Sequence, residues 1–173
     1  SMTDVMLRVV GQTGTNVTRG SEQGLLGLAF DPQYSTPGAL NEGYFYIYYI
    51  APRGVTFVSG GQTYDFGRVI IARIRRNMAD PNLADLSTFK IIMQIDKNAT
   101  NHNTGATNNA LNPTGRLGKL LRLDVALRAG DNPATLTYRI PGDNPTSWPD
   151  SSGNPTAGAR LEAWAKGLRN TWR

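Results

Sequence analysis

The chain has 173 residues and no cysteine, and its 18 Lys and Arg outnumber its 13 Asp and Glu to give a formal net charge of +5. This length allows one domain with a sizeable core, and we treat residues 1–173 as a single domain. The lack of cysteine excludes disulfides and thiolate chemistry, and no apolar run approaches the roughly 18–20 residues of a membrane span. The mildly basic charge favours anionic partners such as phosphates, nucleic acid, an acidic cofactor or an acidic redox protein.

The composition predicts an all-β protein. The 19 glycines and 10 prolines, with many Asn, Thr and Asp residues, are typical of short strands joined by turns. No window has a sustained helical period. Ser1-Met2 is typical of the remnant of a cleaved expression tag, so an original signal peptide would not be visible.

Apolar and β-branched runs predict the strands in chain order. The expected strands are Val5–Val10, Leu25–Phe30, Gly43–Ile50, Arg68–Arg75, Lys90–Ile95 and Leu117–Val125. Residues 53–66 form a loop or a small hairpin, residues 129–159 are rich in turn formers, and residues 161–166 begin a strand or one helical turn.

Leu25–Phe30 is apolar at every position, which is typical of a strand buried on both faces, and Asp31-Pro32 ends it. The aromatic run Gly43–Ile50 is its expected antiparallel neighbour. We expect a core that includes Leu25, Leu28, Phe30, Tyr46, Ile70, Ile92, Leu121 and Leu123.

Arg68–Arg75 alternates, with Ile70, Ala72 and Ile74 on one face and Arg73 and Arg75 on the other. This pattern predicts a half-exposed strand whose arginines lie on a solvated face.

His102 is the only histidine, and it lies in the polar segment Asn101-His102-Asn103-Thr104-Gly105, directly after the expected strand Lys90–Ile95. Loops at strand ends often carry site residues, and a histidine near its ordinary pKa is a common general base. The alternative is a solvated or capping histidine, and the spacing alone does not decide between these two roles.

Four separated segments together carry a family resemblance. They are Glu22–Pro32 with Gly43–Tyr49, Asn101–Gly105, Leu117–Val125 with Ile140–Pro145, and Ala163–Arg173. In this order they resemble the soluble glucose/sorbosone (aldose sugar) dehydrogenases. These are six-bladed β-propellers that use pyrroloquinoline quinone (PQQ) with calcium.

The resemblance implies a role for each matching residue. His102 matches the general base that takes the proton from the anomeric hydroxyl of the sugar while hydride passes to the quinone. Arg169 and Asn170 match the pair that holds the cofactor and its reduced oxygens, and Glu22 matches a residue that faces the cofactor. A cation beside the developing oxyanion and a base beside the hydroxyl are what this chemistry needs. The family also implies an external electron acceptor and a periplasmic or secreted location.

The chain departs from the family in length. The family has a longer strand pair between the His segment and the next motif, whereas here Gly105 is followed within a dozen residues by Leu117-Gly118-Lys119. The family's main calcium ligands follow the Arg-Asn motif, and no calcium ligand is found in this sequence. A blade needs roughly 40–50 residues, so the chain provides about three and a half blades, and we expect an incomplete propeller-like sheet array.

An incomplete ring has unpaired strand edges, so we expect a homo-oligomer, most simply a homodimer. The chain is a fragment, a natural or engineered short form, or one protomer of a ring closed by several chains. Its function is sugar oxidation or, as the alternative, a non-catalytic β-rich binding or assembly role derived from that family. No nucleic-acid-binding motif accompanies the basic charge, so a nucleic-acid partner is not expected.

Overall fold

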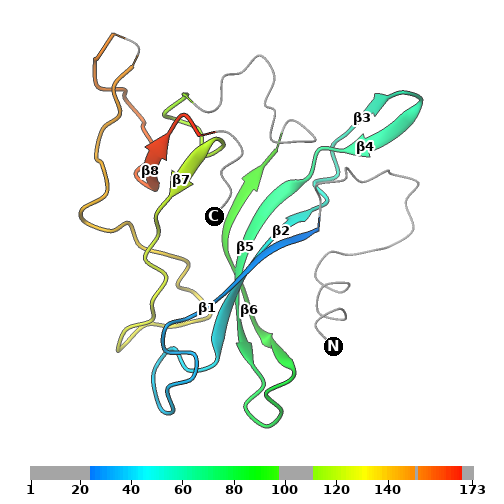
Figure 1. The fold of residues 1–173 in the computed structure, drawn as a ribbon, viewed down its shortest axis with the longest axis vertical. Helices are drawn as coiled ribbons and strands as arrows, with labels where there is room; N and C mark the ends of the chain where they lie inside the picture. The colour runs from blue at the N-terminus through cyan, green and yellow to red at the C-terminus, as the bar shows by residue number, and fades with distance from the viewer. Residues whose placement is uncertain (1–23, 98–110, 151, 169–173) are drawn as a thin grey trace. The chain divides into compact units, whose positions relative to one another are not determined.

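The computed structural model describes residues 24–97, 111–150 and 152–168, and every regular element in these ranges is a β-strand (Figure 1). The all-β prediction is therefore confirmed for this part of the chain. The strands are β1 (Leu25–Phe30), β2 (Tyr44–Ala51), β3 (Thr56–Ser59), β4 (Gln62–Asp65), β5 (Arg68–Arg76), β6 (Ala84–Asp96), β7 (Lys119–Leu121) and β8 (Ala163–Lys166).

The chain forms two compact units. The first contains β1 to β6 together with the segment Val125–Thr137, and the second contains β7, β8 and their connections up to Asp124 and from Tyr138. The expected strand Val5–Val10 lies outside the described residues.

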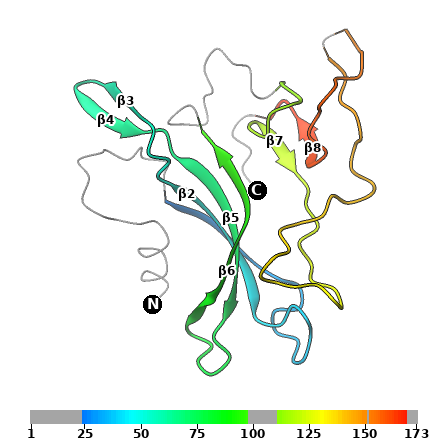
Figure 2. The same cartoon turned by 180° about the vertical axis from the view of Figure 1, so that it is seen from behind.

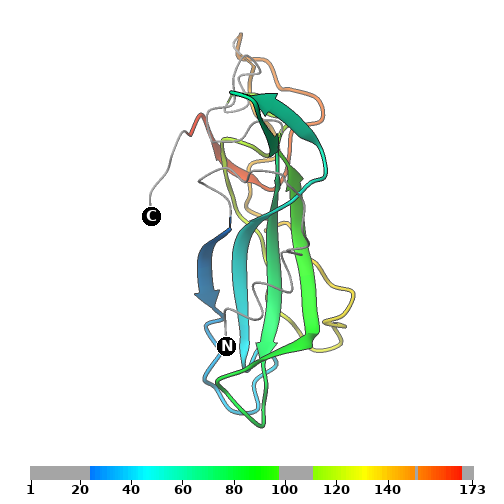
Figure 3. The same cartoon turned by 90° about the vertical axis from the view of Figure 1, so that its right-hand side faces the viewer.

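The main sheet of the first unit is a four-stranded antiparallel meander with the order β1-β2-β5-β6. Figure 3 shows these strands side by side. The expected antiparallel pairing of the first two strands is confirmed, with Phe30 opposite Phe45 and Leu28 opposite Ile47. Between β2 and β5 the chain makes a separate hairpin, β3–β4, so the small-hairpin prediction for residues 53–66 is also confirmed.

One face of this sheet carries the apolar core. Directly opposite residues share a face, and the pairs Phe45 with Ile74, Ile47 with Ala72, and Tyr49 with Ile70 are all buried. Ile92 of β6 is buried as well. The predicted burial of Ile70 and Ile92 is therefore confirmed, since both side chains are buried.

The predicted burial of β1 is wrong. Leu25, Leu28 and Phe30 are 37%, 38% and 59% exposed, respectively. The reason is position, since β1 is the outermost strand of the sheet and pairs only with β2 among the described residues. Tyr46, Leu121 and Leu123 are half-buried and not fully buried.

The predicted solvation of the arginine face is also wrong at its centre. Arg73 is 0% exposed, and its guanidinium donates hydrogen bonds to the carbonyls of Val125 (3.4 Å), Pro133 (2.7 Å) and Leu136 (3.3 Å). The segment that follows Asp124 therefore covers this face of the sheet. Arg75 is half-buried, and its Nε donates to the carbonyl of Glu42 at 2.8 Å.

The second unit has little regular structure. Of the expected strand Leu117–Val125, only Lys119–Leu121 is a strand, although Asp124 forms an isolated bridge with Arg139. Residues 163–166 form the strand β8, which pairs antiparallel with β7 (Figure 2). Within the described ranges, no helix is long and apolar enough to cross a membrane.

Candidate functional site

The residues proposed for catalysis and cofactor binding, Glu22, His102, Arg169 and Asn170, lie outside the described residues. The structure therefore gives no geometry for them. The last described residue before His102 is Lys97, which directly follows the end of β6 at Asp96.

The end of β6 is fixed by two arginines from other parts of the first unit. The Asp96 carboxylate lies 3.4 Å from Nε of Arg53 and 3.1 Å from Nε of Arg68. Arg53 also donates from Nη1 to the carbonyl of Lys97 at 2.6 Å. These contacts hold the last described residues before the segment that carries His102.

Arg53 is itself held at the base of the β3–β4 hairpin by a buried carboxylate. Asp65 accepts backbone hydrogen bonds from Arg53 (2.8 Å), Gly54 (2.7 Å) and Gly67 (2.6 Å). Charge-assisted bonds of this kind are among the stronger hydrogen bonds in proteins. One side chain thus joins the two ends of the hairpin and positions the residue that contacts Asp96 and Lys97.

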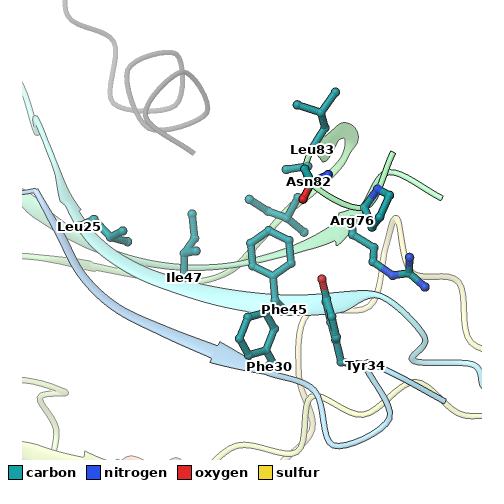
Figure 4. A pocket seen from close by; sticks show the side chains of 11 residues that line it. Leu25, Phe30, Tyr34, Phe45, Ile47, Arg76, Asn82 and Leu83 are labelled. Atoms are coloured by element: carbon teal, nitrogen blue, oxygen red, sulfur yellow. The ribbon is translucent and has the colours of Figure 1, made fainter. Parts of the chain in front are cut away.

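An apolar hollow of about 220 Å³ lies on the core face of the sheet (Figure 4). Phe30, Tyr34 and Phe45 form an aromatic cluster in its wall, with ring centroids of Phe30 lying 4.7 Å from Tyr34 and 6.4 Å from Phe45. Its charged group is the Arg76 guanidinium, which lies 5.9 Å from the centroid of the Tyr34 ring and pairs with Glu42 at 3.0 Å. The hollow therefore suits apolar atoms, and its single charge is already neutralised by Glu42.

The opposite face of the sheet holds a polar cluster. The Tyr46 hydroxyl donates to Oδ2 of Asp31 at 3.2 Å, and Asp31 is itself buried. Burial, followed by the Asp31 charge, raises the pKa of Tyr46 well above its ordinary value. Tyr46 is thus a neutral hydrogen-bond donor at physiological pH and is not poised as a base.

The second unit contains one buried carboxylate with strong partners. Oε1 of Glu162 accepts from Nη2 of Arg116 at 2.5 Å and from the Tyr138 hydroxyl at 2.8 Å. Burial acts to raise the pKa of Glu162, but the hydrogen bonds from Arg116, its own backbone and Tyr138 outweigh burial and lower that pKa. Glu162 is therefore ionised at neutral pH and serves to join three separate segments of this unit.

No three His, Cys, Asp or Glu side chains gather to hold a metal ion within the ranges that the structure describes. We assign no calcium ligand. No family model matches the sequence.

The sequence interpretation did not single out Arg53, Asp65, Asp96, Arg116 or Glu162. A signal existed for Asp65, which stands in a Gly-rich stretch between two expected strands, where a carboxylate often binds turn amides. For Glu162 there was none, because its partner Arg116 lies 46 positions away.

Proposed function

We propose that the chain derives from the soluble PQQ-dependent glucose/sorbosone dehydrogenases and oxidises an aldose sugar at its anomeric carbon. The observation that supports the proposal is that the first resembling segment coincides with two neighbouring strands of a four-stranded sheet. A propeller blade is a four-stranded antiparallel sheet, and β1, β2, β5 and β6 form one such meander. The first resembling segment provides β1 and most of β2.

In this proposal the sheets are arranged as an incomplete propeller, and the chemistry depends on residues beyond the strand ends. His102 follows β6, whose end is fixed by Arg53 and Arg68, and loops that leave a rigid sheet are the usual carriers of catalytic groups. His102 accepts the proton of the anomeric hydroxyl, for which it must be neutral and within hydrogen-bond reach of that hydroxyl.

Arg169 and Asn170 bind and orient the cofactor, with Glu22 facing it. A fixed guanidinium suits the carboxylates of PQQ and offsets negative charge on a reduced oxygen. The bound quinone would supply the hydride acceptor. An external electron acceptor then reoxidises the protein, and the family resemblance implies a periplasmic or secreted location.

The proposal is tested by cofactor binding and by dye-linked aldose oxidation. We expect PQQ with calcium to raise the melting temperature, because a ligand that binds only the folded state stabilises it. His102→Ala should abolish oxidation with cofactor binding nearly intact, whereas Arg169→Ala should weaken cofactor binding itself. Arg160→Ala, which removes an exposed arginine that donates to the carbonyl of Thr114, is the matched control and should retain both properties. Oxidation that persists in His102→Ala would contradict the assigned base.

The second candidate function is a non-catalytic binding or assembly module from the same ancestry. The observation that favours it is the exposed apolar side of β1. In that case PQQ with calcium leaves the melting temperature unchanged, while the protein still associates.

A further inference from the structure

The apolar hollow on the core face of the main sheet is bounded by two parts of the first unit. One wall is the aromatic cluster of Phe30, Tyr34 and Phe45, and residues 81–83 of the connection from β5 to β6 form another (Figure 4). Phe30 and Leu83 line the hollow and are exposed, so it is open to solvent. A small molecule from solution can therefore reach it.

Hydrogen bonds fix the wall that the connection forms. The Asn77 amide donates to the Leu83 carbonyl at 2.8 Å, and the Leu83 amide donates to the Asp80 carbonyl at 3.0 Å. The Asp80 carboxylate also accepts from the amide and from Nδ2 of Asn82, at 3.0 and 3.2 Å. The chain itself thus holds this wall in place, and small-molecule sites are usually pre-formed in this way.

The size and the lining of the hollow suit one aromatic ring. An apolar protein cavity of about 150 Å³ holds a benzene molecule. At about 220 Å³, the hollow has room for one such ring with a short substituent. Aromatic rings pack favourably on other aromatic side chains in tilted or offset arrangements, and the cluster of Phe30, Tyr34 and Phe45 offers such contacts.

The charged groups at the hollow neutralise each other. Nη2 of Arg76 lies 3.0 Å from Oε1 of Glu42, whose Oε2 accepts from the Gly38 amide at 2.9 Å. An anionic ligand would approach Glu42 as well as Arg76, and a cationic ligand would approach Arg76 as well as Glu42. Neither ligand gains an unpaired opposite charge, so the hollow favours a neutral molecule.

Two uncharged polar groups remain for hydrogen bonding to a ligand. The Tyr34 hydroxyl has no hydrogen-bond partner among the residues that the structure describes. Nδ2 of Asn82 donates to Asp80, which leaves Oδ1 of Asn82 as an acceptor. Figure 4 shows the Tyr34 hydroxyl on the same side of the aromatic cluster as Asn82. A hydroxyl group on the ligand can accept from Tyr34 and donate to Asn82, whereas a hydrocarbon can do neither.

We propose that the hollow binds a small neutral phenol. The ring of the phenol lies against Phe30 and Phe45, and its hydroxyl forms hydrogen bonds with the Tyr34 hydroxyl and Oδ1 of Asn82. The site is distinct from the proposed sugar and quinone chemistry, because it uses none of those residues.

The test is thermal melting of the full chain with 4-ethylphenol, ethylbenzene or 4-ethylbenzoate, which place a hydroxyl, no polar group or a negative charge on the same ring. We expect 4-ethylphenol to raise the melting temperature saturably, because it binds the folded state. Ethylbenzene should bind roughly three- to tenfold more weakly, which corresponds to the loss of one hydrogen bond, and 4-ethylbenzoate should give no rise.

Variants separate the hydroxyl from the aromatic wall. Tyr34→Phe removes only the hydroxyl and should weaken 4-ethylphenol binding by the same factor, with ethylbenzene binding unchanged. Tyr64→Phe is its control, because the Tyr64 hydroxyl donates to Gln62 in the β3–β4 hairpin and does not line the hollow. Phe30→Ala should weaken both neutral ligands, whereas Leu26→Ala, at an exposed β1 position that does not line the hollow, should preserve both.

An equal response to all three compounds, or a rise that persists undiminished in Phe30→Ala, would overturn the proposal. Equal binding of 4-ethylphenol by wild type and Tyr34→Phe would show that the assigned hydroxyl contact is wrong. The absence of a rise with every compound would also overturn it, and a melting temperature that then increases with protein concentration would assign the hollow to a second copy of the chain.

Discussion

Gly43 illustrates how a single residue sets the geometry at the start of β2. Its φ is +76°, in the region that favours glycine, and a Cβ placed there would lie 2.8 Å from Cγ of Arg76. Its amide donates to the Tyr34 carbonyl at 2.9 Å, and its carbonyl accepts from the Arg76 amide at 2.7 Å. The turn and the paired strand β5 therefore meet at this position.

We expect Gly43→Ala to destabilise the protein more than Gly38→Ala. Gly38 has nearly the same φ, +77°, but a Cβ there would meet no atom within 4 Å. Both changes introduce the backbone strain of about 1–2 kcal/mol, and only Gly43→Ala adds the cost of displacing Arg76, about 1–3 kcal/mol. Urea denaturation of the two variants measures the difference, and equal free energies of unfolding would show that Arg76 moves without cost.

Glu162 should make stability depend on acid pH. Its pKa is lower in the folded protein than the ordinary 4.5, so its contribution is present above that value and is lost as the pH falls through the folded pKa. The matched variant is Glu162→Gln, which keeps the shape and cannot ionise. We expect its free energy of unfolding to fall less steeply below about pH 4.5 than that of wild type. Parallel curves would mean that other carboxylates, such as Asp143 and Asp150, carry the acid dependence.

The strand β5 depends on residues far away in sequence. Arg73 joins it to the segment after Asp124 through three carbonyls and lies 5.4 Å from the centroid of the Tyr44 ring. The Nη1 and Nη2 groups of this buried guanidinium bind the carbonyls and secure an irregular segment to the sheet face, whereas its Nε has no hydrogen-bond partner within the described ranges.

Arg73→Met should therefore destabilise the first unit by about 3 kcal/mol and expose the segment from Val125 to Leu136 to amide exchange. Arg75→Met is the control on the same strand, where Nε donates to the single carbonyl of Glu42, and it should cost clearly less. Guanidinium denaturation and hydrogen exchange measure both variants. A cost for Arg73→Met no larger than that for Arg75→Met would refute the role of the carbonyl contacts.

The same strands show what local sequence patterns can predict. The runs at β1, β2, β5 and β6 identified strands and an antiparallel pair, because period and composition are local properties. They did not predict that β1 is an outer strand or that Arg73 is buried, since both depend on which distant segment lies alongside. For the candidate site, the resemblance named Glu22, His102, Arg169 and Asn170, whereas the contact of Glu162 with Arg116 joins segments that no local pattern relates.

For the whole molecule, the two outer strands of the main sheet differ in how they meet solvent. β1 has one register shift against β2, no charged residue and no proline, and Leu25, Leu28 and Phe30 share the core face. β6 carries Asp85, Lys90 and Asp96 and has two register shifts against β5. Charges and bulges discourage edge pairing, so β1 is the edge more prone to association.

We therefore expect the protein to associate, most simply as a homodimer, through the β1 side of the sheet. Leu28→Lys should shift the molar mass in light scattering toward the monomer, because it places a charge in the contact. Val58→Lys, at an exposed position of the β3–β4 hairpin, is the control and should leave the mass unchanged. A well-folded wild-type monomer at high concentration would count against this prediction.

The base of the β3–β4 hairpin, which the Asp65 carboxylate holds together, makes the hairpin suitable for protein engineering. Because the Asp65 carboxylate binds the amides of Arg53, Gly54 and Gly67, the two points where the chain leaves and rejoins the main sheet are held together independently of the hairpin's tip. In Figure 3 the hairpin continues beyond the ends of β2 and β5. Residues around Gly60-Gly61 are thus a natural grafting point, where an epitope or a fluorophore-binding peptide can be spliced in while the register of the four main strands is preserved.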